Sequence, residues 1–140
     1  MRNFNRRSAE DGYTLIELLV VLAILGLLAT IATTQVLKYL ASAKLSTAHT
    51  QVESFSSALD LYKLDVGHYP TTQEGLSALI AAPAGAQNWS GPYVKNTASL
   101  NDPWGHPYIY RAPGQHGEFD LYSEGPEGSK GGDPPVKSWR

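Results

Sequence analysis

Glu17 has the most unusual setting in this sequence, because its carboxylate stands at the edge of a long apolar run. Leu15 and Ile16 precede it, and the 20 residues from Leu18 to Leu37 carry no charge. A carboxyl group at membrane depth costs about 2.5 to 3.5 kcal/mol on insertion scales, and such residues usually have a partner and a function. Three interpretations are open. The carboxylate snorkels to the membrane interface, complements the helix dipole in the first turn, or pairs with a cation supplied by another chain.

The third interpretation restricts the nature of that cation. No Lys or Arg on this helix lies within reach before Lys38, so the cation must be a free α-amino group. A cut between Gly12 and Tyr13 creates such an amine. Because breaking a buried pair costs about 3 to 5 kcal/mol while an intact pair is nearly neutral, the pair sets register more than it adds affinity.

The carboxyl-terminal tail from Glu124 to Pro135 is the second place where side chains could do chemistry. Glu127 and Asp133 are hard oxygen ligands on a flexible Gly/Pro-rich loop that can add backbone carbonyls. This combination suits Ca²⁺ better than Mg²⁺. A loop without metal is the alternative. Nucleotide binding is excluded because the tail has no G-x-G-x-x-G or P-loop pattern and no helix follows it.

The remaining reactive residues form no catalytic pattern. The four histidines are too scattered for a metalloprotease or zinc-finger spacing, and no G-x-S-x-G motif occurs. They are His49, His68, His106 and His116. We therefore predict that the protein is not an enzyme. A membrane-anchored periplasmic enzyme is the alternative, and it would keep its activity in a soluble form without residues 13–35.

Composition limits the other classes. A chain of 140 residues allows one small domain and an anchor. The formal net charge is −2, and 17% of the residues are charged, so there is no basic face for nucleic acid. Without cysteine, disulfides, thiolate catalysis and zinc-thiolate sites are all excluded.

The uncharged run is long enough to cross a bilayer. Twenty helical residues span about 30 Å, the thickness of the hydrocarbon core. The preceding leader carries Arg2, Arg6 and Arg7, which favours a cytoplasmic amino terminus. The residues Ala29–Ala32 match a secretory cleavage site poorly, so we expect the run to be retained.

The elements predicted after the uncharged run are those of a small α+β domain. From Lys38 the pattern becomes amphipathic and predicts a helix that ends near Leu64 to Val66, with Gly67 as its left-handed cap. One face is apolar: Leu45, Ala48, Val52, Phe55, Leu59 and Tyr62. A coiled-coil seam is the alternative to packing on the domain.

Three further elements follow in the carboxyl-terminal half. Thr71 and Glu74 have the spacing of a capping box at the start of a short helix that ends near Ala82. The residues 84–103 are expected to form an ordered loop, because Trp89 and Tyr93 are unfavourable in water. The alternating segments 108–110 and 119–122 predict an antiparallel β-hairpin.

The residues Gly12 to Val21 resemble the class III signals of prepilins and pseudopilins. In that family a prepilin peptidase cuts after the Gly and methylates the new amino terminus. The resemblance implies that Gly12 precedes the cut, that Tyr13 becomes the methylated first residue, and that Glu17 neutralises the Tyr13 amine of a neighbouring subunit.

Four downstream segments narrow the resemblance to the major pseudopilins of type II secretion. They are Y-P-T-T-Q-E-G-L from Tyr69, D-P-W-G from Asp102, P-Y from Pro107, and F-D-L-Y-S-E-G from Phe119. Relatives bind Ca²⁺ in the final loop, which implies the Glu124 carbonyl and the Glu127 and Asp133 side chains as ligands here.

The resemblance implies a pilin-like fold and four parts. Residues 1–12 form the leader, 13–35 the transmembrane and assembly helix, 36–66 the amphipathic half of that helix, and 67–140 the periplasmic globular region. The implied function is a homopolymeric pseudopilus subunit, anchored in the bacterial inner membrane. The implied partners are membrane lipid, prepilin peptidase, minor pseudopilins, the platform and the assembly ATPase. A minor pseudopilin or type IV pilin subunit is the alternative.

Overall fold

The computed structural model describes residues 10–95, 100–128 and 134–139, with side chains from Thr14 onward. Its elements follow the order of one long helix, one short helix and three strands. Two compact units can be distinguished, Met1–Ala41 and Ser42–Arg140, and each is described by itself. Only the backbone is described at Gly12 and Tyr13, and Asp133 lies outside the described residues. The roles predicted for these three residues therefore stay predictions.

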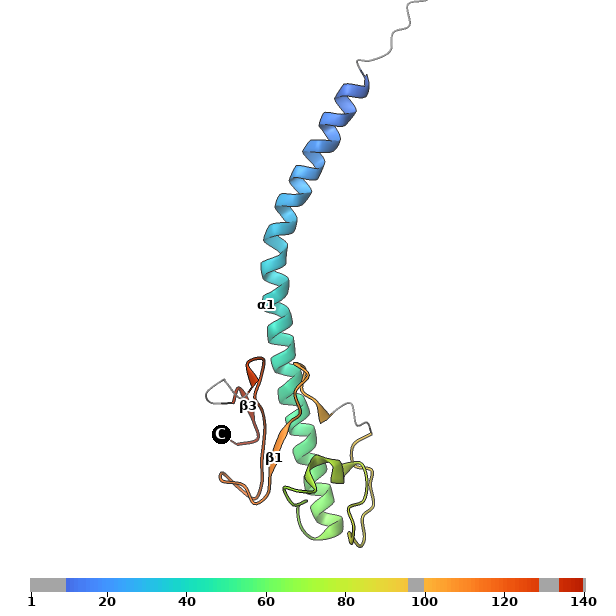
Figure 1. Ribbon diagram of the computed structural model, residues 1–140, viewed down its shortest axis with the longest axis vertical. Helices are drawn as coiled ribbons and strands as arrows, with labels where there is room; N and C mark the ends of the chain where they lie inside the picture. The colour runs from blue at the N-terminus through green and yellow to red at the C-terminus, as the bar shows by residue number, and fades with distance from the viewer. Residues whose placement is uncertain (1–9, 96–99, 129–133, 140) are drawn as a thin grey trace, which may run out of the picture. The chain divides into compact units, whose positions relative to one another are not determined.

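A single helix, α1, extends from Glu10 to Val66 (Figure 1). The prediction of one continuous helix that ends at Leu64 to Val66 is confirmed. It stops at Gly67, whose φ of 93° is the left-handed conformation that glycine adopts without a Cβ penalty. The Gly67 amide donates to the Lys63 carbonyl over 2.8 Å, which closes the last turn.

In the first unit, the apolar residues of α1 are exposed. Leu19 is 68% exposed and Ile31 is 64% exposed. Over the described residues, α1 is the one helix long and apolar enough to cross a membrane, by length and composition. The described side chains of the first unit, from Thr14 onward, therefore form no core of their own.

In the second unit, the same helix provides one wall of a core. Five of the six residues predicted for its apolar face are at most 3% exposed, namely Ala48, Val52, Phe55, Leu59 and Tyr62. Leu45 is the exception at 37% exposed, so its predicted burial is wrong. The packing partners come from later in the chain: Leu76, Ala78, Leu79, Tyr108, Tyr110, Leu121 and Val136.

The short helix is a 3₁₀ helix, η1, from Gly75 to Leu79. The reciprocal hydrogen bonds of the predicted capping box are present, because the Thr71 amide donates to Glu74 Oε2 over 2.7 Å and the Glu74 amide donates to Thr71 Oγ1 over 3.2 Å. They close the turn before η1, whose N-cap residue is Glu74 and has no side-chain cap bond. The helix ends at Leu79 and not near Ala82. The reason is that the Leu79 carbonyl accepts the amides of Tyr93 and Val94, at 2.8 and 3.3 Å, and is not available to extend the helix.

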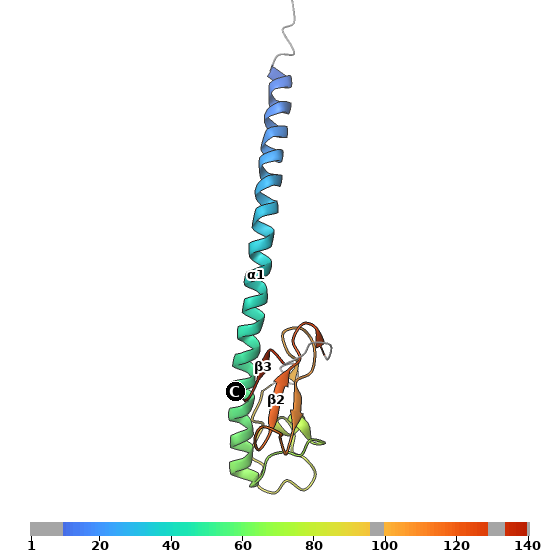
Figure 2. The ribbon, with the colours of Figure 1, turned by 90° about the vertical axis from the view of Figure 1, so that its left-hand side faces the viewer.

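Three antiparallel strands form one sheet in the order β1, β2, β3, and Figure 2 shows them beside the carboxyl-terminal part of α1. Strand β1 is Ile109–Arg111 and β2 is Asp120–Ser123, paired with Tyr110 opposite Leu121, so the predicted hairpin is confirmed. Strand β3, Val136–Lys137, was not predicted, because two residues carry no periodic pattern.

The described part of the 84–103 loop is ordered by its aromatic residues. The Trp89 indole N–H donates to the Ala78 carbonyl over 2.9 Å. The Tyr93 hydroxyl donates to Asp65 over 2.7 Å, and both rings pack against the core. The aromatic residues therefore attach this irregular segment to the rest of the second unit.

Candidate functional site

The predicted processing site lies at the start of α1. Gly12 and Tyr13 both fall within the helical backbone that begins at Glu10. The predicted cleavage bond therefore lies in the first turn of the helix. Tyr13, on the carboxyl-terminal side of that bond, precedes Glu17 by four residues. That spacing corresponds to one helical turn, so positions 13 and 17 share a face.

Glu17 is exposed on α1, and with Ile16, Val20 and Val21 it lines a hollow of about 260 Å³. Among the residues that the structure describes, Glu17 belongs to no ion pair. A cation beside this carboxylate must offset the loss of water from both charges, so an intact pair is nearly neutral and a broken one is costly. All three interpretations of Glu17 remain compatible with this geometry.

The predicted metal loop starts at the end of β2. Glu124 is half-buried and Glu127 is exposed, and both precede the part of the loop that contains Asp133, which lies outside the described residues. Gly125 and Gly128 have φ values of 73° and 61°, so the loop turns sharply here. Within the described residues, no three His, Asp or Glu side chains form a metal-binding group.

A buried hydrogen-bond network anchors the start of this loop, and Asp102 is its centre. Asp102 is 5% exposed and Ser123 is 0% exposed. The Ser123 hydroxyl donates to Asp102 Oδ2 over 2.6 Å, while Asp102 Oδ1 accepts the amides of Trp104 and His106 at 3.0 and 2.8 Å. The carboxylate therefore joins the 102–106 turn to the end of β2.

Two more bonds extend the network into the loop. The Gly125 amide donates to the Ser123 hydroxyl over 3.0 Å. His106 Nδ1 lies 3.0 Å from the Gly125 carbonyl, so this nitrogen carries the proton and donates. The Gly125 carbonyl therefore already accepts a hydrogen bond from His106. The carbonyl that the resemblance assigns to a metal is the preceding one, that of Glu124.

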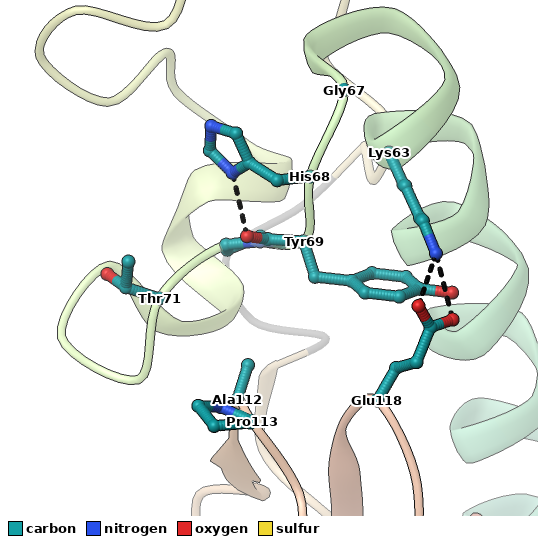
Figure 3. A pocket seen from close by; sticks show the side chains of 9 residues that line it. Lys63, Gly67, His68, Tyr69, Thr71, Ala112, Pro113 and Glu118 are labelled. Carbon is teal, nitrogen blue, oxygen red and sulfur yellow. Dashed lines mark hydrogen bonds and ion pairs between the residues drawn. The ribbon is translucent and has the colours of Figure 1, made fainter.

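A hollow of about 550 Å³ lies between the end of α1 and the β1–β2 turn (Figure 3). Lys63 Nζ is held there by both carboxylate oxygens of Glu118, at 2.6 and 2.8 Å, and lies 4.5 Å from the centre of the Tyr69 ring. Hydrogen bonds from Lys63 hold the pKa of Glu118 below its usual range. Lys63 thus connects the end of α1 to the β1–β2 turn through an ion pair, and its amine is not available as a nucleophile or base.

Tyr69 completes that tether. Its hydroxyl donates to Asp60 Oδ1 over 2.8 Å, and its ring packs edge-on against Phe119 at 4.9 Å. Burial, and then the hydrogen bond to the Asp60 carboxylate, raise the pKa of Tyr69 to about 12. The phenol therefore stays protonated at any physiological pH and acts only as a donor.

Sequence reasoning missed three of these arrangements. The Lys63–Glu118 pair joins residues 55 positions apart, and nothing local indicates it. The His116 ring stacks on the Trp139 ring with centroids 4.2 Å apart, and no local pattern predicts this contact either. Asp102 carried a signal, since Asp-Pro-Trp-Gly is a turn sequence in which an Asp side chain accepts nearby amides.

An amino-terminal helix with an exposed apolar first half, followed by a small domain with an antiparallel three-stranded sheet, defines the pilin-like class of proteins. Comparison with family models supports this class and narrows it. Residues 35–139 match the model "Type II secretion system (T2SS), protein G", and residues 7–33 match "Prokaryotic N-terminal methylation motif". The chain therefore belongs to the protein G family of type II secretion systems.

Relatives agree over almost the entire chain. Type II secretion system core protein G of Pseudomonas aeruginosa is 43% identical, covering 96% of this chain and 98% of that protein. The Escherichia coli K12 core protein G is 38% identical, covering 93% and 91%. The crystal structure of the major pseudopilin from the type 2 secretion system of enterohaemorrhagic E. coli matches with a TM-score of 0.61 and 31% identity, covering 70% of this chain and 88% of that one.

Proposed function

We propose that this chain is a structural subunit that polymerises into the periplasmic pseudopilus of type II secretion and so drives the export of folded proteins across the outer membrane. Family membership supports this function, and one structural observation carries it. The first half of α1 exposes its large apolar residues, Leu15 to Leu40, along a single helix with one embedded carboxylate. Such a surface needs lipid before assembly and other apolar helices afterwards.

The orientation follows from the charges beside the span. The basic residues before the apolar run favour a cytoplasmic amino terminus in the inner membrane. The second unit, which contains the sheet, then lies in the periplasm. A cysteine-reactive, membrane-impermeant label on Ser57→Cys, an exposed site on α1, should react in intact spheroplasts. A matched Asn5→Cys in the leader of a peptidase-deficient strain should react only after lysis.

Processing is the first step in the proposed assembly. Prepilin peptidase cuts between Gly12 and Tyr13 and methylates the Tyr13 amine, consistent with the matched methylation motif at 7–33. The intact mass of protein extracted from membranes should lack residues 1–12 and include one additional methyl group. An uncut chain in cells that secrete normally would contradict the proposal.

Glu17 then pairs with the Tyr13 amine of a neighbouring copy and sets the axial register of the polymer. In Glu17→Gln the side chain keeps its size and loses its charge, so insertion and cleavage should be normal while filaments are lost. Glu53→Gln is the matched control, because Glu53 is an exposed carboxylate on the same helix within the second unit. Normal filaments from Glu17→Gln, counted by electron microscopy, would refute the pairing.

The final loop binds Ca²⁺ in this proposal, through the Glu124 carbonyl and the Glu127 and Asp133 side chains. These are hard oxygen donors, and the two left-handed glycines at 125 and 128 give the loop the sharp turns that a calcium loop needs. When bound, the ion would crosslink the loop and stabilise the domain. Millimolar Ca²⁺ should raise the melting temperature of the wild type more than that of Glu127→Gln, and an equal shift, or none, would exclude this site.

The chain catalyses nothing itself in this proposal, and other components supply energy and position. Those partners are minor pseudopilins, an inner-membrane platform and an assembly ATPase. Chemical crosslinking in the native membrane should recover homo-oligomers in wild type and not in Glu17→Gln. Crosslinks to the platform should persist in both, because they precede polymerisation.

A further inference from the structure

The carboxyl-terminal strand β3 has too little backbone pairing to hold itself on the sheet. It contains only Val136 and Lys137, which pair with Ser123 and Tyr122 of β2. A typical strand has three to ten residues. Something besides the strand ladder must therefore keep the chain end in place.

Side chains beyond the strand provide part of the attachment. The Ser138 amide donates to the Leu121 carbonyl over 2.8 Å, and the Leu121 amide donates to the Ser138 hydroxyl over 3.1 Å. The hydroxyl thus replaces a backbone carbonyl as the next acceptor in the ladder. Val136 is fully buried, but it is the sole residue that β3 contributes to the core cluster.

Trp139 adds the remaining attachment by packing on the β1–β2 turn. Its ring is stacked on the His116 imidazole with centroids 4.2 Å apart and planes inclined by 2°. The Tyr122 ring meets it edge-on at 5.7 Å. An aromatic ring in contact with two others loses both burial and specific ring contacts when it is removed.

His116 is held in position for this stack by a buried carboxylate. Asp120 is 3% exposed and accepts the amides of Gln115 and His116 at 2.8 and 3.1 Å. His116 Nδ1 lies 3.2 Å from the same carboxylate and donates to it. Three hydrogen bonds therefore fix both the turn and the plane of the imidazole before Trp139 packs on it.

We propose that His116 and Trp139 form a clasp that closes the carboxyl-terminal strand onto the sheet. The clasp works through protein groups alone and needs no ion in the connection between β2 and β3. Opening it releases residues 136–139 as a unit and leaves β1, β2 and the α1 core in place, because Tyr110 and Leu121 hold those strands to the core independently.

Hydrogen exchange of the full-length protein in detergent tests the clasp. Trp139→Ala and His116→Ala should each speed exchange of the amides at 136–138 at least about tenfold, which corresponds to about 1.4 kcal/mol of opening free energy. Amides of β1 should exchange as in wild type, whereas the Leu121 amide should speed up together with 136–138, because it donates to the Ser138 hydroxyl. His116→Phe keeps an aromatic ring for the stack and should restore most of the protection, whereas His49→Ala, on an exposed position of α1, should change nothing.

Two outcomes would overturn the clasp. One is unchanged exchange at 136–138 in Trp139→Ala, and the other is equal acceleration across all three strands, which would make Trp139 an ordinary core residue. The wild type is also measured with EDTA and with Ca²⁺. Protection of 136–138 that persists in EDTA supports the clasp whether or not the loop binds calcium, and protection that requires Ca²⁺ refutes it.

Discussion

Replacing Asp102 by Ala should destabilise the second unit more than most single substitutions. The carboxylate is 5% exposed and accepts three hydrogen bonds, from the Ser123 hydroxyl and from the amides of Trp104 and His106. Hydrogen bonds to charged groups contribute about 1.5 to 3 kcal/mol each, but bonds in one network are not additive. We expect a loss of about 3 to 5 kcal/mol, because the substitution leaves the buried Ser123 hydroxyl and two partly buried amides without their acceptor.

That loss is large compared with the stability of a small domain. Domains unfold with about 5 to 15 kcal/mol, and one kcal/mol shifts the melting temperature of a chain of about 100 residues by about 4 to 8 °C. Asp102→Ala should therefore lower the melting temperature by at least about 12 °C. The shift should be followed by near-UV circular dichroism, since far-UV signal from α1 would mask the change in the small sheet.

A double-mutant cycle separates the network from a general effect of the substitution. Ser123→Ala alone should cost about 1 to 3 kcal/mol, and it should cost much less in the Asp102→Ala background, because its acceptor is then already gone. Glu53→Ala, an exposed acid, should stay within about 0.5 kcal/mol of wild type. Additive losses in the double variant, or a shift below about 2 °C for Asp102→Ala, would show that the network does not carry this stability.

Three further substitutions, with Leu64→Ala as an exposed control, test other parts of the fold by chemical or acid denaturation. Leu59→Ala empties a fully buried site and should cost about 2 to 5 kcal/mol, whereas Leu64→Ala, 79% exposed, should have little effect on the isolated subunit. Gly67→Ala has open space for its Cβ but forces Ala to a φ of 93°, so it should lower the free energy of unfolding by about 1 kcal/mol or more. The slope of the unfolding free energy against denaturant concentration should stay unchanged. Burial acts to raise the pKa of Asp120, but hydrogen bonds from Gln115 and His116 outweigh it and leave that pKa below the ordinary 3.8. The stabilisation is therefore present above about pH 3.8 and is lost as the pH falls through the pKa of Asp120 in the folded protein. Asp120→Asn should be less stable at neutral pH, and its stability should fall less steeply than that of wild type as the pH is lowered. A fall as steep as in wild type would contradict this.

The sequence was most informative where a physical period repeats. The spacing of apolar residues from Ala48 to Tyr62 predicted both the helix and its buried face, because 3.6-residue periodicity follows directly from helix geometry. Leu45 fits the same period yet stays 37% exposed. Periodicity identifies a face, but the length of the face that is covered depends on how far the sheet extends along it.

Features that depend on distant residues could not be predicted. Lys63 and Glu118 are separated by 55 positions, and each alone is an ordinary surface charge. Strand β3 is two residues long, and its attachment depends on a ring stack between His116 and Trp139. For the candidate site, the sequence indicated Gly12, Tyr13 and Glu17 through a local motif, and the loop ligands only through resemblance, because metal ligands converge by tertiary structure.

The two halves of α1 place opposite demands on their surroundings. In the second unit Leu59 and Tyr62 are fully buried by the chain itself, whereas in the first unit Ile16 and Leu19 remain 66% and 68% exposed. Burying one such side chain is worth about 1.5 to 3 kcal/mol, so the first unit is unstable in water. Lipid tails and neighbouring apolar helices cover these residues about equally well, and apolar burial therefore does not decide between membrane and polymer. In the proposed polymer, the one charge between Thr14 and Leu37 makes that difference, because an unpaired Glu17 is unfavourable in lipid and the proposed pairing with a neighbouring Tyr13 amine neutralises it. If Glu17 pairs as proposed, control of assembly lies with a single carboxylate, while the apolar residues around it determine only that the helix avoids water.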